Sequence, residues 1–532
     1  MMTNSITIYK SWVPKWMIRL AIFMVLLPSM GLFGLSTANM SAAVGYYGIE
    51  PADVQYSMII FYAAVASFFA LERRFFNYVV ARHYLILVSV IQICTSYICY
   101  TTHSLGILFL FRFVQGMANS AITSICITLI FRQIHNERAR EIGYSVFYGM
   151  LLCIGPFTTL ITAPVLDAFD FNVLYKAIIF TSVPGTVFLF IIMNSIRLNK
   201  KFPLYQLDWA SFIIYATGLC LLGYVLIYGQ QYYWFQDKRI ILATAALVFI
   251  FALHLLRQIK LKRPYLDQSV FRYRNYVIGA VLVFVLYICR GAMSVTSAYF
   301  ATVLGMDPIH IGQLMIYNMV GILISVIISS RLITLKKPMR LIWMTGFLFL
   351  LTYHVWMSFL FDTQADANTF IMPLMIQGLG AGMLMTPIIV FMISSVPAPI
   401  SNSASAIGVF FRFTGFSGSM ALINYFQLSG QLFHLNRFQQ SLSVIDPAVA
   451  TRLDGYKQFL INRGMTSEQA VRLSNGLFSK SITLQAQLRA YMDYYHIISW
   501  IILAVILLIA LYPYFNRTSI NLRHNQPSPA TY

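Results

Sequence analysis

Fourteen apolar stretches dominate this chain of 532 residues, and each is long enough to cross the roughly 30 Å hydrocarbon core of a bilayer. Only 10% of the residues are charged, whereas soluble proteins carry about 25%. The sequence therefore predicts an all-α integral membrane protein with fourteen transmembrane helices. The predicted spans are residues 17–37, 55–71, 84–102, 107–131, 142–165, 174–196, 209–229, 239–256, 276–302, 310–334, 340–361, 369–395, 404–427 and 494–515.

Lysine and arginine gather in alternate loops between these spans. Basic residues follow the second, fourth, sixth, eighth and tenth spans, whereas the short intervening loops carry Asp and Glu, apart from the pair Lys238 and Arg239. Since basic loops stay on the cytoplasmic side, both termini are predicted to be cytoplasmic. The same loops explain the net charge of +20, which in a soluble chain would favour nucleic acid, so no nucleic-acid partner is expected.

We expect no metal, no cofactor and no ATP hydrolysis. The six cysteines lie in apolar runs without the spacing of metal ligands, and the sequence has no GxxxxGK(S/T) phosphate-binding loop. A membrane enzyme would need His with Asp or Glu at one membrane face, and the nearest such group, His135 with Glu137 and Glu141, lies in a basic loop. We therefore predict a gradient-driven transporter with no catalytic site.

The fourth span carries an arginine, Arg112, about one turn from its start, followed by Gln115. An arginine within a span costs roughly 2.5–3.5 kcal/mol, so it normally faces a protein interior or a water-filled cavity. Arg112 and Gln115 are therefore candidates for the transport pathway. The alternatives are an arginine satisfied by backbone carbonyls and a glutamine that holds two helices together.

The pattern around Gln115 and Gly116 returns 262 residues later at Gln377 and Gly378. In the spans that follow, Ile142–Gly143 is likewise matched by Ile407–Gly408. The sequence thus predicts two related halves around an internal pathway, with Gln377 as a further pathway candidate.

Charged residues within the spans are arginines. Arg112, Arg290 and Arg412 lie inside predicted spans, whereas no Asp or Glu lies at the middle of one. A cavity lined by guanidinium groups without carboxylates favours anionic or neutral substrates over cations. The alternatives are that Arg290 extends toward a membrane edge and that Arg412 joins two helices.

Proton coupling needs a group that changes charge, and the spans offer three candidates. They are Glu72 at the inner end of the second span, Asp167 at the outer end of the fifth and His354 in the eleventh. A histidine has an ordinary pKa near 6.5, which suits a proton shuttle, although a packed histidine is the alternative for His354. An arginine does not deprotonate in proteins, so Arg112 could only modulate a neighbour.

Several motifs occur in an order and spacing that resemble a known family. They are Arg112 to Gly116, Gly149 with Gly155–Pro156, Leu207–Asp208–Trp209, the basic stretch 263–276, Gln377–Gly378 with Gly380, and residues 403–406 with Arg412. Together they resemble the major facilitator superfamily, and within it the fourteen-helix drug/proton antiporters of the EmrB/QacA type, over residues 15–515. In that family the fourth-helix arginine is implicated in proton coupling and the Gly–Pro pair belongs to an antiporter motif. The other glycines are expected at close helix contacts.

The loop after the second span departs from the family pattern of a Gly, an Asp and a basic pair. Asn77 stands at the aspartate, Arg73 and Val80 stand at the glycines, and Arg82 is kept. Asn77 and Arg82 are thus the remnant of this loop motif.

The resemblance implies the major facilitator fold, with two six-helix bundles and two extra central helices. The expected divisions are a cytoplasmic N-terminus 1–16, a first bundle 17–196, the extra helices with a basic loop 197–275, a second bundle 276–515 and a cytoplasmic tail 516–532. Within the second bundle, the extracytoplasmic segment 428–491 has helical periodicity, with Gly464 as a stop and Thr466 as a start. Short amphipathic helices over the outer face are expected there.

The resemblance also implies the function. It predicts a proton-coupled multidrug or lipophilic-compound exporter that works by alternating access in the inner (plasma) membrane. The implied partners are small-molecule substrates, protons, the lipid bilayer and, in a Gram-negative host, a periplasmic adaptor with an outer-membrane channel. The alternative is a gradient-driven importer or facilitator of an anionic metabolite on the same fold.

Overall fold

The computed structural model describes residues 8–134, 139–197, 207–442 and 446–511. Fourteen of its helices are long and apolar enough to cross a membrane, which confirms the predicted number of spans. In the described residues the regular structure is helical, apart from one isolated β-bridge between Tyr9 and Met193. The chain is an all-α membrane protein.

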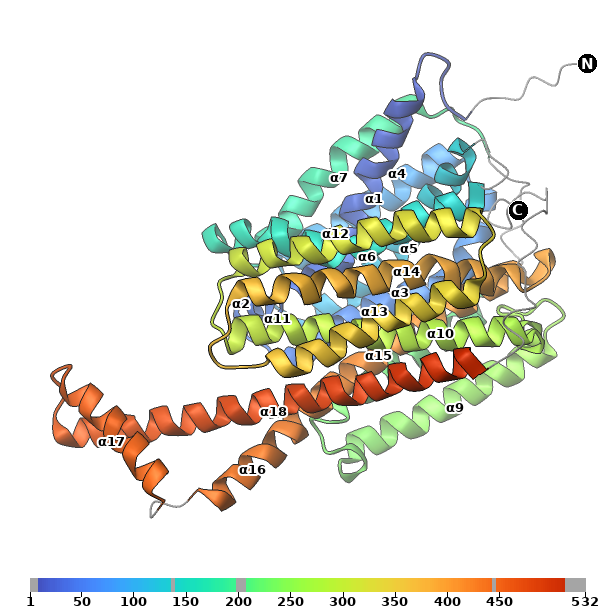
Figure 1. Ribbon diagram of the computed structural model, residues 1–532. Helices are drawn as coiled ribbons and strands as arrows, with labels where there is room; N and C mark the ends of the chain where they lie inside the picture. The colour runs from blue at the N-terminus through green and yellow to red at the C-terminus, as the bar shows by residue number, and fades with distance from the viewer. Residues whose placement is uncertain (1–7, 135–138, 198–206, 443–445, 512–532) are drawn as a thin grey trace, which may run out of the picture.

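Two bundles of six spans form the body of the molecule (Figure 1). The first contains α1 (Lys15–Ala38), α3 (Pro51–Tyr78), α4 (Ala81–Thr101), α5 (Leu105–Gln133), α6 (Ala139–Ala168) and α7 (Val173–Ile192), with a short α2 (Met40–Tyr47) after α1. The second contains α10 (Arg274–Arg290) continued by α11 (Ala292–Thr302), α12 (Pro308–Thr334), α13 (Met339–Leu360), α14 (Ile371–Ser394), α15 (Ser401–Tyr425) and α18 (Ser467–Leu511). The bundles meet along two seams, where α6 packs on α12 and α3 packs on α15.

The two bundles have equivalent close contacts between helix backbones, one at Gly116 and one at Gly378. A Cβ atom added to Gly116 on α5 would lie 2.2 Å from the backbone oxygen of Phe61 on α3. A Cβ atom added to Gly378 on α14 would lie 2.2 Å from the backbone oxygen of Asn318 on α12. Each glycine therefore lets two helices of its bundle touch through their backbones, at equivalent places in the two halves.

The two extra spans, α8 (Trp209–Tyr228) and α9 (Lys238–Lys260), lie beside both bundles. Helix α8 packs on α3 and α15, and α9 packs on α8. Asp208 caps α8 through Ser211 and forms an ion pair of 2.9 Å with Arg257 on α9. Burial alone would raise the pKa of Asp208, but hydrogen bonds from Ser211 and the charge and hydrogen bond of Arg257 outweigh burial and hold this pKa below its ordinary value.

We call the end of the bundles where α1 begins and α18 ends the terminal end, and the opposite end the hairpin end. From the hairpin end α16 (Gln431–Ser441), α17 (Pro447–Ile461) and the first half of α18 project away from the body (Figure 1). Thr466 and Gln469 cap the start of α18 reciprocally, and Gly464 adopts a left-handed backbone with φ of +89°, as the sequence predicted.

The placement of this segment differs from the sequence-based expectation. Its helices do not lie flat over one face, because α18 continues for 45 residues from the projection into the membrane span. At 1.5 Å per residue it is roughly 68 Å long, which is about twice the thickness of the hydrocarbon core. No proline interrupts residues 467–511, so nothing in the sequence ends the helix at the membrane surface.

Candidate functional site: a central cavity with two arginines

A cavity of about 1290 Å³ lies between the two bundles. Its lining comes from α1, α2, α3, α5 and α6 of the first bundle and from α10, α11, α12, α14, α15, α16 and α18 of the second half of the chain. It extends from Pro51 and Pro308 near the hairpin end to Thr128, Tyr144 and Ser405 near the terminal end. The cavity thus follows the interface along which the bundles would move in alternating access.

Arginines are the charged residues of the described cavity lining. Arg290 and Arg412 line it, and the described lining includes no Asp, Glu, Lys or His. Both arginines are half-buried and lie on helices that pack together, α10 and α15. The cavity therefore carries two fixed positive charges without a carboxylate among its described lining residues.

Arg412 connects the two bundles through Tyr148. Its Nη1 atom donates a hydrogen bond of 3.3 Å to the Tyr148 hydroxyl on α6, and its guanidinium lies 5.6 Å from the centre of that ring. Its Nε atom is buried without a hydrogen-bond partner in the described chain. Arg412 thus keeps unused hydrogen-bonding capacity at the cavity.

Arg290 lies at the break between α10 and α11. A Cβ atom on the next residue, Gly291, would lie 1.6 Å from Ser419 Oγ on α15, so the break depends on a residue without a side chain. The Arg290 guanidinium lies 5.3 Å from the centre of the Tyr287 ring. It has no hydrogen bond or ion pair with another described residue, so its donors remain available for a ligand.

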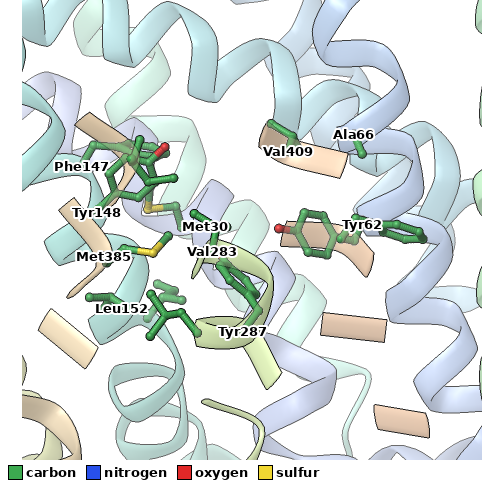
Figure 2. Close-up of a cluster of buried hydrophobic side chains, with 14 of the residues drawn as sticks. Met30, Tyr62, Ala66, Phe147, Tyr148, Leu152, Val283, Tyr287, Met385 and Val409 are labelled. Carbon is green, nitrogen blue, oxygen red and sulfur yellow. The ribbon is translucent and has the colours of Figure 1, made fainter. Parts of the chain in front are cut away.

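Aromatic rings surround the arginines. The rings of Phe33 on α1, Tyr62 on α3 and Phe416 on α15 contact one another, with centroids 5.2–5.6 Å apart. Figure 2 shows the Tyr62 hydroxyl pointing from the first bundle toward the side where Tyr287 and Tyr148 lie. Tyr62 is close enough to interact electrostatically with both Arg412 and Arg290. An apolar, aromatic ligand could therefore lie on these rings while an anionic group reaches the arginines.

A pair of amides joins the bundles between the arginines and the hairpin end. Gln55 on α3 donates to Asn424 Oδ1 over 3.0 Å, and Asn424 on α15 donates to Gln55 Oε1 over 2.7 Å. Both side chains are buried. This reciprocal contact holds α3 against α15 on the hairpin side of the cavity.

Arg112 and Gln115, the leading sequence candidates, lie inside the first bundle and outside the cavity lining. Arg112 is fully buried, donates to Leu32 O over 3.3 Å and to Gln115 Oε1 over 2.9 Å, and lies 4.6 Å from the centre of the Phe61 ring. Gln115 donates to Ser96 Oγ over 3.0 Å. Gln115 thus forms a buried polar contact between helices. Arg112 is only partly satisfied in this way, because its Nε and Nη2 atoms are buried without a hydrogen-bond partner in the described chain.

Gln377 lies on the cavity, unlike its counterpart Gln115. Its Oε1 atom accepts a hydrogen bond of 2.5 Å from Asn318 Nδ2, and both residues line the cavity. Asn318 also donates to Leu374 O over 2.9 Å. Gln377 thus remains a pathway candidate, oriented by an asparagine from α12.

The three titratable candidates lie outside the cavity lining. Asp167 is exposed near the end of α6, whereas Glu72 and His354 are buried. Glu72 lies on α3 close to Tyr84 of α4. His354 lies on α13 between the rings of Tyr353 and Tyr495, and its Nδ1 atom is 2.7 Å from Leu350 O. The structure therefore brings neither residue into contact with Arg290 or Arg412.

The motif glycines occupy two kinds of place. Gly149 lies on the α6–α12 seam, where an added Cβ atom would be 3.3 Å from Val326, and Gly380 lies against Leu350 and Gly346 of α13. Gly155 and Pro156 line the cavity instead. Two of these motif residues thus lie at helix contacts and two form part of the cavity wall.

The loop remnant lies at the terminal end of the first bundle. Arg82 donates to Ser195 Oγ over 3.2 Å and its guanidinium lies 3.8 Å from the centre of the Phe190 ring. The Asn77 side chain lies outside the described part of the structure, as do His135 and Glu137.

Sequence reasoning missed the tyrosines and the amide pair of the cavity. Tyr62, Tyr148 and Tyr287 look like ordinary aromatic residues in apolar runs, and no spacing distinguishes them. Gln55 and Asn424 could have been suspected, because an amide inside a span needs a hydrogen-bond partner.

Comparisons with known proteins agree with this architecture. Residues 17–422 match the Major Facilitator Superfamily. The multidrug export protein EmrB of Escherichia coli (strain K12) is 22% identical over 404 residues, which cover 73% of this chain and 74% of EmrB. The probable multidrug resistance protein EmrY of the same strain is 25% identical over 358 residues, covering 66% of this chain and 67% of EmrY.

Solved structures share the fold at low sequence identity. A crystal structure of the peptide transporter POT in complex with sulfate has a TM-score of 0.58 and 14% identity, covering 96% of this chain and 97% of that one. The crystal structure of the human organic anion transporter MFSD10 has a TM-score of 0.50 and 12% identity, covering 79% of this chain and 95% of that one. With its fourteen spans and its EmrB and EmrY relatives, this chain belongs to the Major Facilitator Superfamily and fits the drug-exporter branch of that family.

Proposed function

We propose that this protein is a secondary transporter that exports lipophilic compounds by alternating access, with anionic and neutral substrates preferred over cations. The observation that carries the preference is the charge of the cavity, where Arg290 and Arg412 face no carboxylate among the described lining residues. A cation that leaves water for this cavity would lose hydration and meet two like charges, whereas an anion would gain two partners.

Export is favoured over import by the named activity of the relatives, because EmrB is a multidrug export protein. An importer or facilitator of an anionic metabolite could use the same cavity, and the direction of flux in vesicles separates the two. The basic loops at the terminal end support an inner-membrane protein with both termini in the cytoplasm. The hairpin end would then face outward.

A partner protein is proposed for the projecting helices. Large apolar side chains remain exposed on this projection, including Leu432, Phe433, Phe459, Leu473 and Leu477. Exposed apolar groups on helices that project from the body of the molecule support a docking face for a periplasmic adaptor. Co-purification with an adaptor that survives deletion of α16 and α17 would contradict this proposal.

Proton coupling is proposed from the family resemblance alone. Glu72, Asp167 and His354 remain its candidates, although all three lie outside the described cavity lining. If Glu72→Gln, Asp167→Asn and His354→Gln variants all transport as the wild type does across a pH gradient, coupling through these groups is wrong.

The test of the substrate preference uses three probes that share one ring system and differ in charge. They are naphthalene-2-sulfonate, naphthalene-2-sulfonamide and trimethyl(2-naphthyl)ammonium, which are anionic, neutral and cationic at neutral pH. We expect purified protein in liposomes to transport the sulfonate at least about tenfold faster than the ammonium probe, because tenfold corresponds to only about 1.4 kcal/mol of differential binding.

Protein-free liposomes are the control for passive leakage of the probes. Faster transport of the ammonium probe than of the sulfonate would contradict the proposed preference. Efflux from inverted vesicles compared with right-side-out vesicles then establishes the direction.

A further inference from the structure

We infer that the turn between the two extra helices is a strap that holds the bundles together at the hairpin end, so that this end of the cavity opens only when the strap releases one bundle. The strap comprises residues 228–236, from the last residue of α8 to the end of the short helix η2 (Trp234–Gln236). The inference rests on the proposed alternating access and gives a role to α8 and α9, which belong to neither bundle.

Two side chains of the strap bind the first bundle. The Tyr228 hydroxyl donates a hydrogen bond to Asp53 Oδ1, and the Gln231 Nε2 atom donates to Glu50 Oε2. Both acceptors are carboxylates at the start of α3, where Glu50 is the N-cap residue. The Tyr228 ring also lies 5.4 Å from the ring of Tyr56 on α3, measured between centroids. Hydrogen bonds to a charged acceptor are roughly twice as strong as those between neutral groups, so the strap is held firmly to α3.

Gln230, next to Gln231, binds the second bundle. Its Nε2 atom donates to Ser429 Oγ in η6 (Phe426–Gly430), the segment that continues α15. Its amide oxygen accepts a hydrogen bond of 2.9 Å from Trp234 Nε1 within the strap, which directs the amide nitrogen toward Ser429. Gln230 is buried, which limits competition from water. The adjacent side chains Gln230 and Gln231 therefore reach opposite bundles.

The backbone of the strap is held in one tight conformation. Tyr233 and Trp234 both have φ of +54°, a left-handed conformation that is uncommon for residues other than glycine. The Trp234 amide donates to Gly229 O over 2.6 Å, and a Cβ atom on Gly229 would lie 2.8 Å from the Trp234 ring. Such a conformation persists only where the surrounding contacts hold it. We therefore expect the strap to move as one body with the bundle that keeps it.

The contacts of the strap lie beyond the amide pair Gln55–Asn424, toward the hairpin end. Asp53 precedes Gln55 by two residues at the start of α3, and Ser429 follows Asn424 by five residues at the end of α15. In alternating access the bundles separate at the two ends in turn. Opening the hairpin end therefore requires the amide pair and one side of the strap to break.

The contacts also indicate which side of the strap breaks. Helix α8 packs more extensively on α3 than on α15. Two strap residues bind carboxylates of the first bundle, whereas Gln230 binds the neutral hydroxyl of Ser429 on the second. The bond from Gln230 to Ser429 is thus the weaker attachment. The strap and α8 stay with the first bundle and leave the second when the hairpin end opens.

The experiment links the strap to each bundle in turn by a cleavable bridge in the full-length chain. One protein carries Gln230→Cys with Ser429→Cys, and the other carries Gln231→Cys with Glu50→Cys. Both also carry Cys94→Ala, because Cys94 is the exposed native cysteine. Ethylene bismethanethiosulfonate bridges each pair, mass spectrometry verifies the bridge, and dithiothreitol removes it. Transport of naphthalene-2-sulfonate in liposomes is measured before bridging, after bridging and after reduction.

We expect the bridge from residue 230 to residue 429 to stop transport and dithiothreitol to restore it, because the second bundle can no longer leave the strap. The bridge from residue 231 to residue 50 should leave transport close to that of the unbridged protein. Transport that continues with the first bridge in place, or that stops equally with either bridge, would overturn the inference. Wild-type protein that is folded and does not transport the sulfonate would instead contradict the proposed function.

Discussion

Replacing Arg290 or Arg412 by glutamine is expected to raise the KM for naphthalene-2-sulfonate at least about thirty-fold while leaving transport of the neutral sulfonamide close to that of the wild type. Removing one partner of a buried, hydrogen-bonded charge pair costs about 2–5 kcal/mol, and the lower limit corresponds to that factor. The neutral probe forms no ion pair with either arginine. The difference in KM change between the two probes therefore isolates the electrostatic contribution. The initial rate of uptake into liposomes, measured at increasing probe concentration, gives the KM for the sulfonate and for the sulfonamide.

The two arginines are expected to differ in their effect on turnover. Arg290 has no hydrogen-bond partner in the described chain, so its loss should act on substrate affinity alone. Arg412 also donates to Tyr148 across the bundles, so its loss should lower kcat as well. Tyr148→Phe removes that hydrogen bond and keeps the charge, which separates the two contributions of Arg412.

Arg331→Gln is the matched control for both variants. Arg331 is an exposed arginine on α12 that does not line the cavity. Thermal stability of each purified variant shows whether it is folded. An unchanged KM for the sulfonate in folded Arg290→Gln and Arg412→Gln proteins would contradict a role of these arginines in binding the anion.

The fold could be predicted from the sequence because the membrane imposes one strong pattern. Long apolar runs must be helices that satisfy their own backbone, so their number and order followed from hydrophobicity. The equivalence of Gly116 and Gly378 was visible as well, because a close contact between helix backbones tolerates only a very small residue.

The position of each polar residue relative to the cavity could not be predicted in the same way. On a helix that is apolar all round, periodicity does not show which face points to lipid, to a neighbour or to a cavity. Arg112 and Arg412 therefore looked alike in the sequence, although one is buried beside Gln115 and the other lines the cavity. The length of α18 was missed for a related reason, because its polar first half and apolar second half form one continuous helix.

Gly116→Ala is expected to destabilise the first bundle strongly, although alanine is the better helix former by about 1 kcal/mol. The added Cβ atom would lie 2.2 Å from Phe61 O and 2.8 Å from Ala64 Cβ on α3. Two backbones cannot give way as a flexible side chain can, so α3 and α5 must separate, and overpacking of this kind costs about 1–3 kcal/mol or more. We expect a lower melting temperature and a lower yield of monodisperse protein, measured by fluorescence-detected gel filtration after heating.

Gly106→Ala is the matched control, because it makes the same substitution on the same helix where no atom lies within 4 Å of the added Cβ. It should be neutral or slightly stabilising, and equal melting temperatures for the two variants would contradict the close contact. The Gly116 variant should also disturb Arg112, since the guanidinium lies 4.6 Å from the centre of the Phe61 ring and the Phe61 backbone is the group that the new Cβ atom displaces. The α3–α5 contact therefore also supports the position of a buried guanidinium, whose Nη1 atom donates to Leu32 O and Gln115 Oε1 inside the first bundle.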